Sequence, residues 1–254
     1  MKHQPRKRFG QNFLHDQTII DAIISSVNAK PNQCIVEIGP GHGALTYPLL
    51  KQARALTVIE IDRDLVEKLE TQNLEDLTIV SADALKLDFS TLYQSKPLRI
   101  VGNLPYNIST PLLLRFVEAH EIINDITVML QQEVIDRLVA TPGNKTFGRL
   151  SVLMQSVFNV EKIVSVPPAA FRPAPKVQSA VVRLAPHRKW HLTGDELKKL
   201  QRLTQLAFAN KRKTLRNNLS KHINTEAIEA LGIDPGRRAE TLSLEEFHAL
   251  NKLL

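Results

Sequence analysis

Short apolar runs rich in Val and Ile alternate with longer segments of mixed character between about residues 31 and 184. Such alternation is typical of strands and helices that follow one another around a largely parallel sheet. It predicts strands at 35–38, 56–61, 77–80, 99–101, 126–130, 156–160 and 180–184. Helices are expected at 18–27, 44–52, 63–71, 111–119 and 133–140. No obvious helix separates the last two strands, so we expect an antiparallel pair at the edge of the sheet.

The pattern changes twice in the second half of the chain. Residues 166–175 contain four prolines, which exclude regular structure and indicate a fixed, extended loop near a site. After Pro186 the spacing becomes helical, with leucines at Leu197, Leu200, Leu203, Leu206, Leu215 and Leu219. Thr225 and Ser243 are the expected N-caps of later helices. We therefore predict an α/β domain over 1–187 and a small all-α domain over 188–254.

Composition restricts the class of protein. A chain of 254 residues with 43% hydrophobic content can bury a full core. No apolar stretch approaches the roughly 18 residues that span a bilayer, and the basic N-terminus lacks the apolar core of a secretory peptide. The single cysteine, Cys34, excludes an internal disulfide and a cysteine-based zinc cage. We expect a cytoplasmic, monomeric protein without a metal or a membrane partner.

The net charge of +7 is unevenly distributed. Residues 188–254 hold 13 Lys and Arg against 8 Asp and Glu, and the first eight residues hold four basic side chains. Such asymmetry favours a polyanionic partner such as nucleic acid, because phosphate contacts supply most sequence-independent affinity. The alternative is a solubilising surface.

A glycine-rich turn follows the first strand of the predicted sheet. Its glycines, Gly39, Gly41 and Gly43, fall as G-x-G-x-G, whereas the dinucleotide fingerprint needs G-x-G-x-x-G. Pro40 removes an amide that would otherwise cradle a pyrophosphate, and no Gly-Lys-Ser/Thr follows. The turn brings a ligand close to backbone amides, but the pattern does not favour a polyphosphate.

Two acidic residues at neighbouring strand ends indicate the ligand. Glu60 ends the second strand, where a carboxylate accepts both hydrogen bonds of a ribose diol. Asp83 follows the third strand, where it accepts from an adenine amine. Together they describe a nucleoside with an uncharged or cationic tail, and S-adenosylmethionine fits that description. Each acid alone would be explained as a solvated strand end or a helix cap.

Asn103-Leu104-Pro105-Tyr106 follows the fourth strand and has the composition expected of a binding site for a flat, amine-bearing base. The Asn103 side-chain oxygen and the Leu104 main-chain carbonyl are expected to accept the protons of an exocyclic amine. Pro105 fixes the turn, and the Tyr106 ring stacks on the base. Taken alone, the tetrapeptide is better explained as an ordinary turn.

The chain resembles the ribosomal RNA adenine dimethyltransferase family, and within it the housekeeping type that acts on the small ribosomal subunit. The resemblance covers nearly the whole sequence. It rests on the ordered set of segments 9–14, 37–43, 60–62, 83–84, 103–106, 171–177, 179–182 and 210–219. It implies a Rossmann-like, class I S-adenosylmethionine-dependent methyltransferase sheet, followed by a helical domain over 188–254 that binds ribosomal RNA.

The same resemblance assigns roles to individual positions. It implies that a lid segment over 1–16 closes on the cofactor through Asn12 and Leu14, and that Gly39 approaches the methionine part. Glu60 would hold the ribose and Asp83 the adenine, while Asn103 would lie where methyl donor and target amine meet. Gly41, Ile61 and Ala84 complete the expected cofactor site. The implied substrate is two adjacent adenosines near the 3′ end of 16S ribosomal RNA, within the immature 30S subunit.

Two further sets of residues are candidates for contact with RNA. Phe171, in the proline-rich loop, is the candidate for the second face of the target base, with a role as core anchor as the alternative. A basic set is expected to hold phosphates, and its C-terminal members are expected on one helix with Leu215 and Leu219 facing inward. The set comprises Arg6, Lys7, Arg8, Lys211, Arg212, Lys213 and Arg216.

Three other functions remain compatible with parts of the sequence. A relative that dimethylates a large-subunit adenosine and confers antibiotic resistance shares the glycine loop and the tetrapeptide. A binding or assembly factor that has lost catalysis would retain the fold. A DNA adenine methyltransferase would share the site but not the flanking segments.

Overall fold

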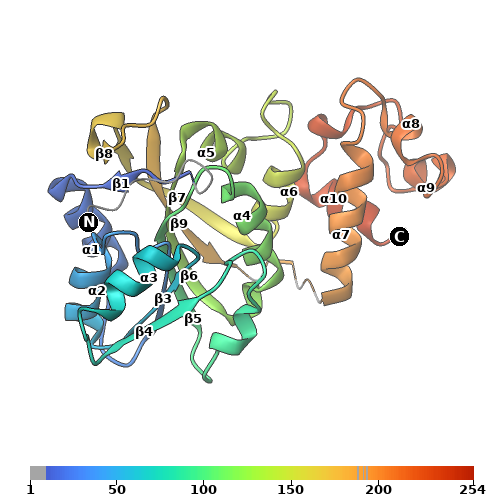
Figure 1. Cartoon of the computed structure of the whole chain (residues 1–254). Helices are drawn as coiled ribbons and strands as arrows, with labels where there is room; N and C mark the ends of the chain where they lie inside the picture. Colours follow the sequence, from blue (N-terminus) through green and yellow to red (C-terminus); the bar gives the residue numbers. More distant parts are fainter. Residues whose placement is uncertain (1–9, 188, 191, 193) are drawn as a thin grey trace. The chain divides into compact units, whose positions relative to one another are not determined.

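The computed structural model describes residues 10–187, 189–190, 192 and 194–254 of the chain (Figure 1). Two compact units are present: one comprises residues up to Ile135 together with Val160–Pro186, and the other comprises Asp136–Asn159 together with His187–Leu254. The helical unit therefore contains 136–159 in addition to the C-terminal segment, whereas the expected boundary assigned those residues to the α/β domain. The basic residues Arg6, Lys7 and Arg8 lie outside the described part of the chain.

The first unit is built on a seven-stranded sheet in the order β4-β3-β2-β5-β6-β9-β7. Parallel pairing joins β4 to β3, β3 to β2, β2 to β5 and β5 to β6. The last two strands lie side by side at one edge of the sheet, as expected, with β7 outermost. The antiparallel pairing that the structure shows there joins β9 to β6. The strands are β2 (Cys34–Ile38), β3 (Leu56–Glu60), β4 (Leu77–Ser81), β5 (Leu98–Asn103), β6 (Ile123–Gln131), β7 (Phe158–Val166) and β9 (Ser179–Pro186).

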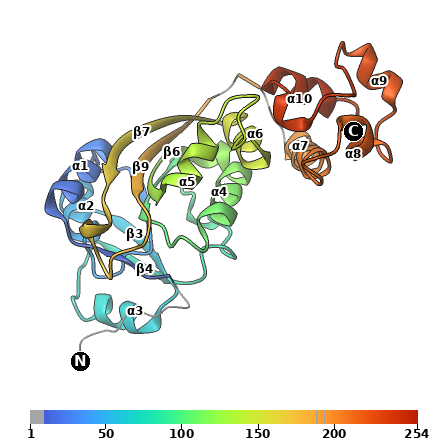
Figure 2. The same ribbon diagram turned by 90° about the horizontal axis from the view of Figure 1, so that it is seen from above.

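Helices cover both faces of this sheet. The helices α1 (Gln17–Val27), α2 (Thr46–Ala53) and α3 (Arg63–Glu70) lie on one side, and α4 (Ser109–Glu118) lies on the other (Figures 1 and 2). Opposite faces are expected because the right-handed crossovers β2-α2-β3 and β5-α4-β6 run in opposite directions across the sheet. A hydrophobic core packs α1 and α2 against the sheet, with Ile23, Val27, Leu49 and Val58 almost completely buried.

A two-stranded ribbon adds the N-terminal segment to this unit. β1 (Phe13–Leu14) pairs antiparallel with β8 (Phe171–Arg172). The short helix η4 (Pro168–Ala170) and β8 lie within the proline-rich segment, so the expectation that its prolines exclude regular structure was wrong for residues 168–172. The ribbon fixes residues 13–14 against a loop that is distant in sequence.

A buried charge cluster lies at the amino end of β5. The Arg99 guanidinium donates to both oxygens of Asp125 at 2.8 Å, to Gln33 at 2.8 Å and to the Val27 carbonyl at 2.7 Å. Burial raises the pKa of Asp125, but the hydrogen bonds and charges of Arg99 and Arg183 outweigh it and leave the pKa below its usual value. The cluster ties β5 to β6 and to the end of α1.

The second unit is helical. Its helices are α6 (Arg149–Gln155), α7 (Gly194–Ala207), α8 (Leu215–Leu219), α9 (Thr225–Ala230) and α10 (Leu244–Asn251), and α5 (Gln132–Leu138) crosses the boundary between the units. Ser243 caps α10 as expected, in a capping box with Glu246. The N-cap of α9 is Asn224, so the prediction of Thr225 was wrong by one residue.

Aromatic and polar contacts explain why residues 136–159 belong to the helical unit. The ring of Trp190 stacks on His248 of α10 with centroids 4.3 Å apart, and the His248 ring bonds Ser156 at 2.9 Å. His187 also contacts the Gln155 carbonyl at 2.9 Å. Burial lowers the pKa of His248 to about 4, so the ring is neutral in these contacts at neutral pH.

The basic residues 211–213 do not lie on a helix, which corrects one expectation. They form a turn between α7 and α8, with Thr214 as the N-cap of α8, so Arg216 alone of the four is helical. Asn210 ends the preceding segment, and its carbonyl accepts from the Lys213 amide at 3.0 Å. Leu215 and Leu219 are completely buried, as expected.

Candidate active site

A pocket of about 320 Å³ lies at the carboxyl edge of the parallel strands. Because β2, β3 and β5 are parallel neighbours, the residues that follow them or end them share this edge. Gly39 follows β2, Glu60 ends β3 and Asn103 ends β5, and all three line the pocket. The edge also receives Asp83, from the loop after β4.

The glycine-rich turn allows the backbone to approach a ligand closely. Gly39 and Gly41 have φ angles of 70° and 57°, in the left-handed region that side chains disfavour. A Cβ at Gly41 would lie 3.0 Å from the Phe13 ring, which packs above the turn. The Gly39 amide donates to the Ile59 carbonyl at 2.9 Å, which ties the start of the turn to β3.

Two carboxylates are held by backbone amides at this edge. Glu60 Oε1 accepts from the Ile61 and Asp62 amides, both at 2.9 Å. Burial raises the pKa of Glu60, opposed by the Asp62, Ile61 and Gly41 amides. Asp83 Oδ1 accepts from the Leu85 amide at 3.0 Å, and its Oδ2 has no partner among the described residues. Each carboxylate is therefore oriented before any ligand arrives.

The N-terminal segment 10–14 crosses the pocket and is tied on both sides. The Gln11 side chain donates to Asp62 Oδ2 at 2.9 Å, and Asp62 is completely buried as the N-cap of α3. The Phe13 ring lies 4.1 Å from the His42 ring, centroid to centroid. Asn12 and Leu14 line the pocket between these contacts.

Asn103 is oriented by the same segment. Its side-chain nitrogen donates to the main-chain carbonyl of Asn12 at 2.8 Å. A carbonyl accepts and cannot donate, so this bond fixes which end of the amide is the nitrogen. The Asn103 side-chain oxygen is left as an acceptor with no partner in the described part of the chain.

Leu104 and Tyr106 complete the wall beside Asn103. The Leu104 side chain is buried, and no described group donates to its carbonyl oxygen. The Tyr106 ring is half-buried and lines the pocket, and its hydroxyl bonds the Ser179 hydroxyl at 2.7 Å. Burial raises the pKa of Tyr106, opposed by the Ser179 contact, so the phenol stays protonated at neutral pH.

Phe171 is absent from the pocket, which corrects the expectation that it contacts the target base. Its side chain is 2% exposed and belongs to the hydrophobic core, together with Leu14, Ala170 and Val181. The pairing of β8 with β1 turns the ring inward, so the alternative role as core anchor holds.

Sequence reasoning missed several pocket residues. Glu37 is 1% exposed in the middle of β2, and its carboxylate accepts from the Thr46 hydroxyl at 2.7 Å. An acidic residue inside an apolar strand is a signal of a buried site that was available in the sequence. Gln11 and Phe13 were also missed, and only their position between candidate residues would have indicated them.

The charge of the pocket indicates what it holds. Its lining contains the three carboxylates Glu37, Glu60 and Asp83, but neither Lys nor Arg among the residues described. Such a lining disfavours phosphate groups and suits a nucleoside with a cationic tail.

In the part of the chain that the structure describes, no cluster of three His, Cys, Asp or Glu side chains forms a candidate metal site. Within that part, no helix is long and apolar enough to cross a membrane.

The sheet order, the glycine turn and the acid at the end of the next strand define a class I S-adenosylmethionine-dependent methyltransferase. Bound S-adenosylmethionine supplies a methyl group that its sulfonium already activates. A model of the ribosomal RNA adenine dimethylase family matches residues 2–254. The chain belongs to this family and is a ribosomal RNA adenine dimethyltransferase that uses S-adenosylmethionine.

Curated relatives match over almost their whole length. The chain is 50% identical to the ribosomal RNA small subunit methyltransferase A of Laribacter hongkongensis, covering 98% of this chain and 96% of the relative. It is 51% identical to the protein of the same name from Acinetobacter baylyi, covering 98% and 92%.

Solved structures show the same fold. A dimethyladenosine transferase from Plasmodium falciparum matches with a TM-score of 0.79 at 25% identity, covering 94% of this chain and 95% of that one. The 23S rRNA methyltransferase ErmE matches with a TM-score of 0.69 at 28% identity, covering 96% and 99%.

The pocket acid Glu37 predicts a pH-dependent affinity for the cofactor. Burial raises the pKa of Glu37 to about 7, against a smaller lowering by Thr46, and the Glu60 charge raises it further. Below this pKa the free protein is protonated at Glu37, whereas a cationic ligand favours the carboxylate. The affinity should therefore fall as the pH falls, with a dissociation constant about tenfold weaker near pH 6 than near pH 8.

Isothermal titration calorimetry with S-adenosylmethionine measures this dependence. Glu37→Gln keeps the shape of the side chain but removes its titration, so its affinity should vary much less over the same range. Equal pH dependence in both proteins would show that Glu37 does not titrate with binding.

Proposed function

We propose that this enzyme transfers methyl groups to N6 of two adjacent adenosines near the 3′ end of 16S ribosomal RNA, within the immature 30S subunit. The names of the relatives at about 50% identity support the small subunit as the substrate. The large-subunit alternative is less supported, because ErmE matches at only 28% identity. A ribosomal substrate supports a cytoplasmic location, and a pocket lined by one chain supports action as a monomer.

The pocket divides into a donor side and an acceptor side in this proposal. On the donor side, Gly39 and Gly41 receive the methionine part, while Glu60 and Ile61 hold the ribose. Asp83 accepts from the adenine amine through its second oxygen, beside Ala84. Asn12 and Leu14 cover the donor, because the segment 10–14 is tied to Asp62 and to Asn103.

On the acceptor side, the target amine meets the Asn103 side-chain oxygen and the Leu104 carbonyl. Two acceptors at these positions hold the amine protons and direct the nitrogen lone pair toward the methyl group. As the N–C bond forms, the C–S bond breaks with its electron pair left on sulfur, and an amine proton then passes to water. The main contribution of the protein is to position the amine against the methyl group. The single observation that carries this proposal is that the Asn103 side chain is oriented with its oxygen free.

Asn103→Ala tests the acceptor role. It should lower methyl transfer to undermethylated small subunits by about 100-fold or more, the size of effect seen when one preorganised polar group is lost. The dissociation constant for S-adenosylmethionine should change by less than about threefold, because the donor side keeps its acids and glycines and the segment 10–14 keeps its contacts with Asp62 and His42. Radiolabelled donor and calorimetry give the two values. A loss of cofactor affinity as large as the loss of transfer would refute the acceptor role.

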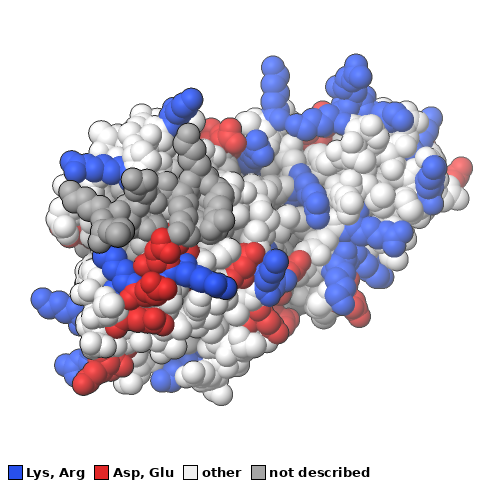
Figure 3. All heavy atoms as spheres, viewed as in Figure 1, with Lys and Arg blue, Asp and Glu red and all other residues white. Residues whose placement is uncertain are grey.

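The helical unit supplies a basic surface for the ribosomal RNA in this proposal. Lys211, Arg212, Lys213 and Arg216 are all exposed at the turn before α8 and on its first residues. Basic side chains are prominent over the region of the C-terminal helices (Figure 3). None of the four has an acidic partner among the described residues, so their charge is available to phosphate oxygens.

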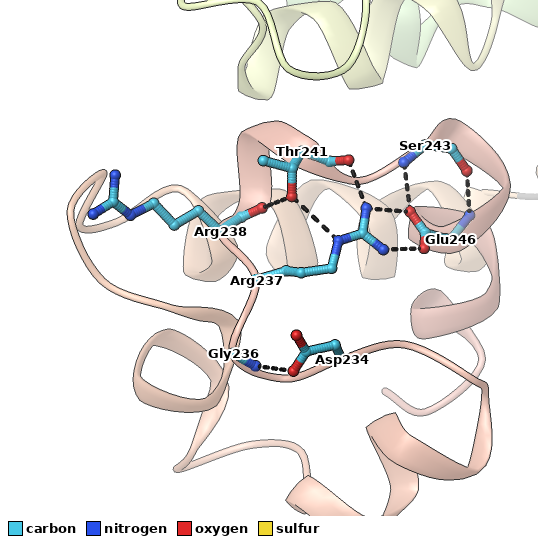
Figure 4. A network of polar contacts seen from close by, with 7 residues as sticks. All are labelled: Asp234, Gly236, Arg237, Arg238, Thr241, Ser243 and Glu246. Carbon is cyan, nitrogen blue, oxygen red and sulfur yellow. Dashed lines mark hydrogen bonds and ion pairs between the residues drawn. The ribbon is translucent and has the colours of Figure 1, made fainter.

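The start of α8, directly after this turn, is held in place by hydrogen bonds to a loop that is itself anchored. The Leu215 amide donates to the Arg237 carbonyl at 2.8 Å, and the Arg216 amide donates to the Pro235 carbonyl at 2.9 Å. The Arg237 guanidinium in turn bonds Glu246 and the Thr241 carbonyl (Figure 4). The start of α8 therefore has a fixed place within its unit, which supports a role in ordered contact with RNA.

Neutralising the turn tests the RNA surface. The triple variant Lys211→Ala, Arg212→Ala, Lys213→Ala should bind small subunits more weakly, and the slope of log affinity against log salt should fall by up to about 3. The matched control removes the exposed charges of Lys198, Lys199 and Arg202 on α7 of the same unit. Filter binding over a salt series measures both. Equal slopes for the two triple variants would count against the proposed surface.

A further inference from the structure

Ser179 occupies a position that neither the core nor the pocket explains. It is the first residue of β9, where it pairs with Gln131 at the end of β6. Its side chain is 1% exposed and lies outside the pocket lining. The Gln132 amide donates to the Gln178 carbonyl at 3.0 Å, so the backbone on this side is fixed as well. The hydroxyl therefore lies at a fixed strand end, in a position where an apolar side chain would serve the core.

The one partner of this hydroxyl in the described structure is a pocket residue. Ser179 Oγ lies 2.7 Å from the Tyr106 hydroxyl. Tyr106 itself lies in the turn after β5, outside regular structure, so its ring is less constrained by the backbone than a strand residue would be. Because burial keeps the phenol protonated, the two hydroxyls share one hydrogen bond at neutral pH. The bond holds the far end of the ring to β9 while the near end is held by the β5 turn.

We propose that Ser179 is a positioning residue that sets the orientation of the Tyr106 ring and, through it, of the target adenine. This inference rests on the proposed function, in which Tyr106 stacks on that base. A base takes its tilt from the ring on which it stacks, and a displacement of about 1 Å in a reacting atom costs about 100-fold in rate. A ring released from Ser179 would no longer define where the amine meets Asn103 and Leu104.

The two methyl transfers depend on this orientation to different degrees. In the first, the amine offers two protons, one each for the Asn103 oxygen and the Leu104 carbonyl. After that transfer only one N–H remains, so one of the two polar contacts is lost. The second transfer then relies more on the stacking of the base on the Tyr106 ring. Ser179 should therefore matter most for the conversion of monomethyladenosine to dimethyladenosine.

The test compares four variants in single-turnover reactions with undermethylated small subunits: Ser179→Ala, Ser179→Thr, Tyr106→Phe and the double variant Ser179→Ala/Tyr106→Phe. Mass spectrometry of nucleosides separates the monomethylated from the dimethylated product. Ser179→Ala should slow the second transfer about tenfold and the first by less than about threefold, so that monomethyladenosine accumulates. Threonine keeps the hydroxyl and should restore the wild-type ratio. Tyr106→Phe should match Ser179→Ala, and the double variant should be no worse than either.

Other product patterns would overturn the proposal. Equal slowing of both transfers without rescue by Ser179→Thr would mean that the residue serves only the fold. Additive effects in the double variant would mean that Ser179 does not act through the Tyr106 hydroxyl. Failure of the wild-type protein to methylate small subunits would instead refute the proposed function.

A second measurement needs no substrate. The chain has three tyrosines, so ring-¹³C-labelled tyrosine gives few NMR signals, and the Tyr106→Phe spectrum identifies the Tyr106 signal. Ser179→Ala should shift or broaden the Tyr106 signal and leave those of Tyr47 and Tyr93 in place. An unchanged Tyr106 signal would show that the ring does not depend on Ser179, and would overturn the proposal whatever the substrate.

Discussion

The close approach of β2 and β5 at their carboxyl ends is the constraint on which the site depends. A Cβ at Gly102 would lie 2.6 Å from the Ile38 carbonyl oxygen, so the two strands meet at a distance that only glycine allows. Gly39 comes directly after Ile38 and has a left-handed backbone conformation. A Cβ at Gly39 would lie 3.9 Å from the Asn103 carbonyl oxygen. Two glycines thus bring together the glycine-rich turn and Asn103, which are the proposed sites of the methyl donor and the target amine.

The N-terminal segment connects the two sides that the strands bring together. It is tied to Asp62, next to the acid proposed for the ribose, and its Asn12 carbonyl orients Asn103. Both sides of the pocket are therefore tied to one short segment. The proposed mechanism needs no general base, because the pocket presents oriented acceptors and a sulfonium methyl group requires placement more than activation.

The sequence predicted the parallel strands well because each is a short apolar run between turn residues. The expected strands at 35–38, 56–61 and 77–80 differ from β2, β3 and β4 by one residue at an end. Parallel neighbours place their carboxyl ends at one edge, so the meeting of Gly39, Glu60, Asp83 and Asn103 also followed from the pattern. By contrast, α6 was missed because Leu150 to Met154 are all buried, which removes the polar face that marks a helix in sequence.

Contacts between distant segments could not be predicted from the sequence. Phe171 lies in a loop whose pairing with β1 decides whether the ring faces the core or the pocket, and nothing local specifies that pairing. The loop at 235–237 accepts the first amides of α8 and so fixes where α8 begins, which a periodicity of leucines does not reveal. The Asn12 carbonyl beside Asn103 is a main-chain group 91 residues away in sequence, so no residue type indicates it.

The central claim is that one pocket presents a methyl donor to an adenine amine of small-subunit ribosomal RNA. Its most direct test is to map methylated adenosines in isolated, undermethylated small and large ribosomal subunits after reaction with the protein and S-adenosylmethionine. The account predicts N6,N6-dimethyladenosine at two adjacent positions near the 3′ end of the small-subunit RNA, and none in the large subunit. Modification of the large-subunit RNA alone, or tight binding to small subunits without any methyl transfer, would contradict it.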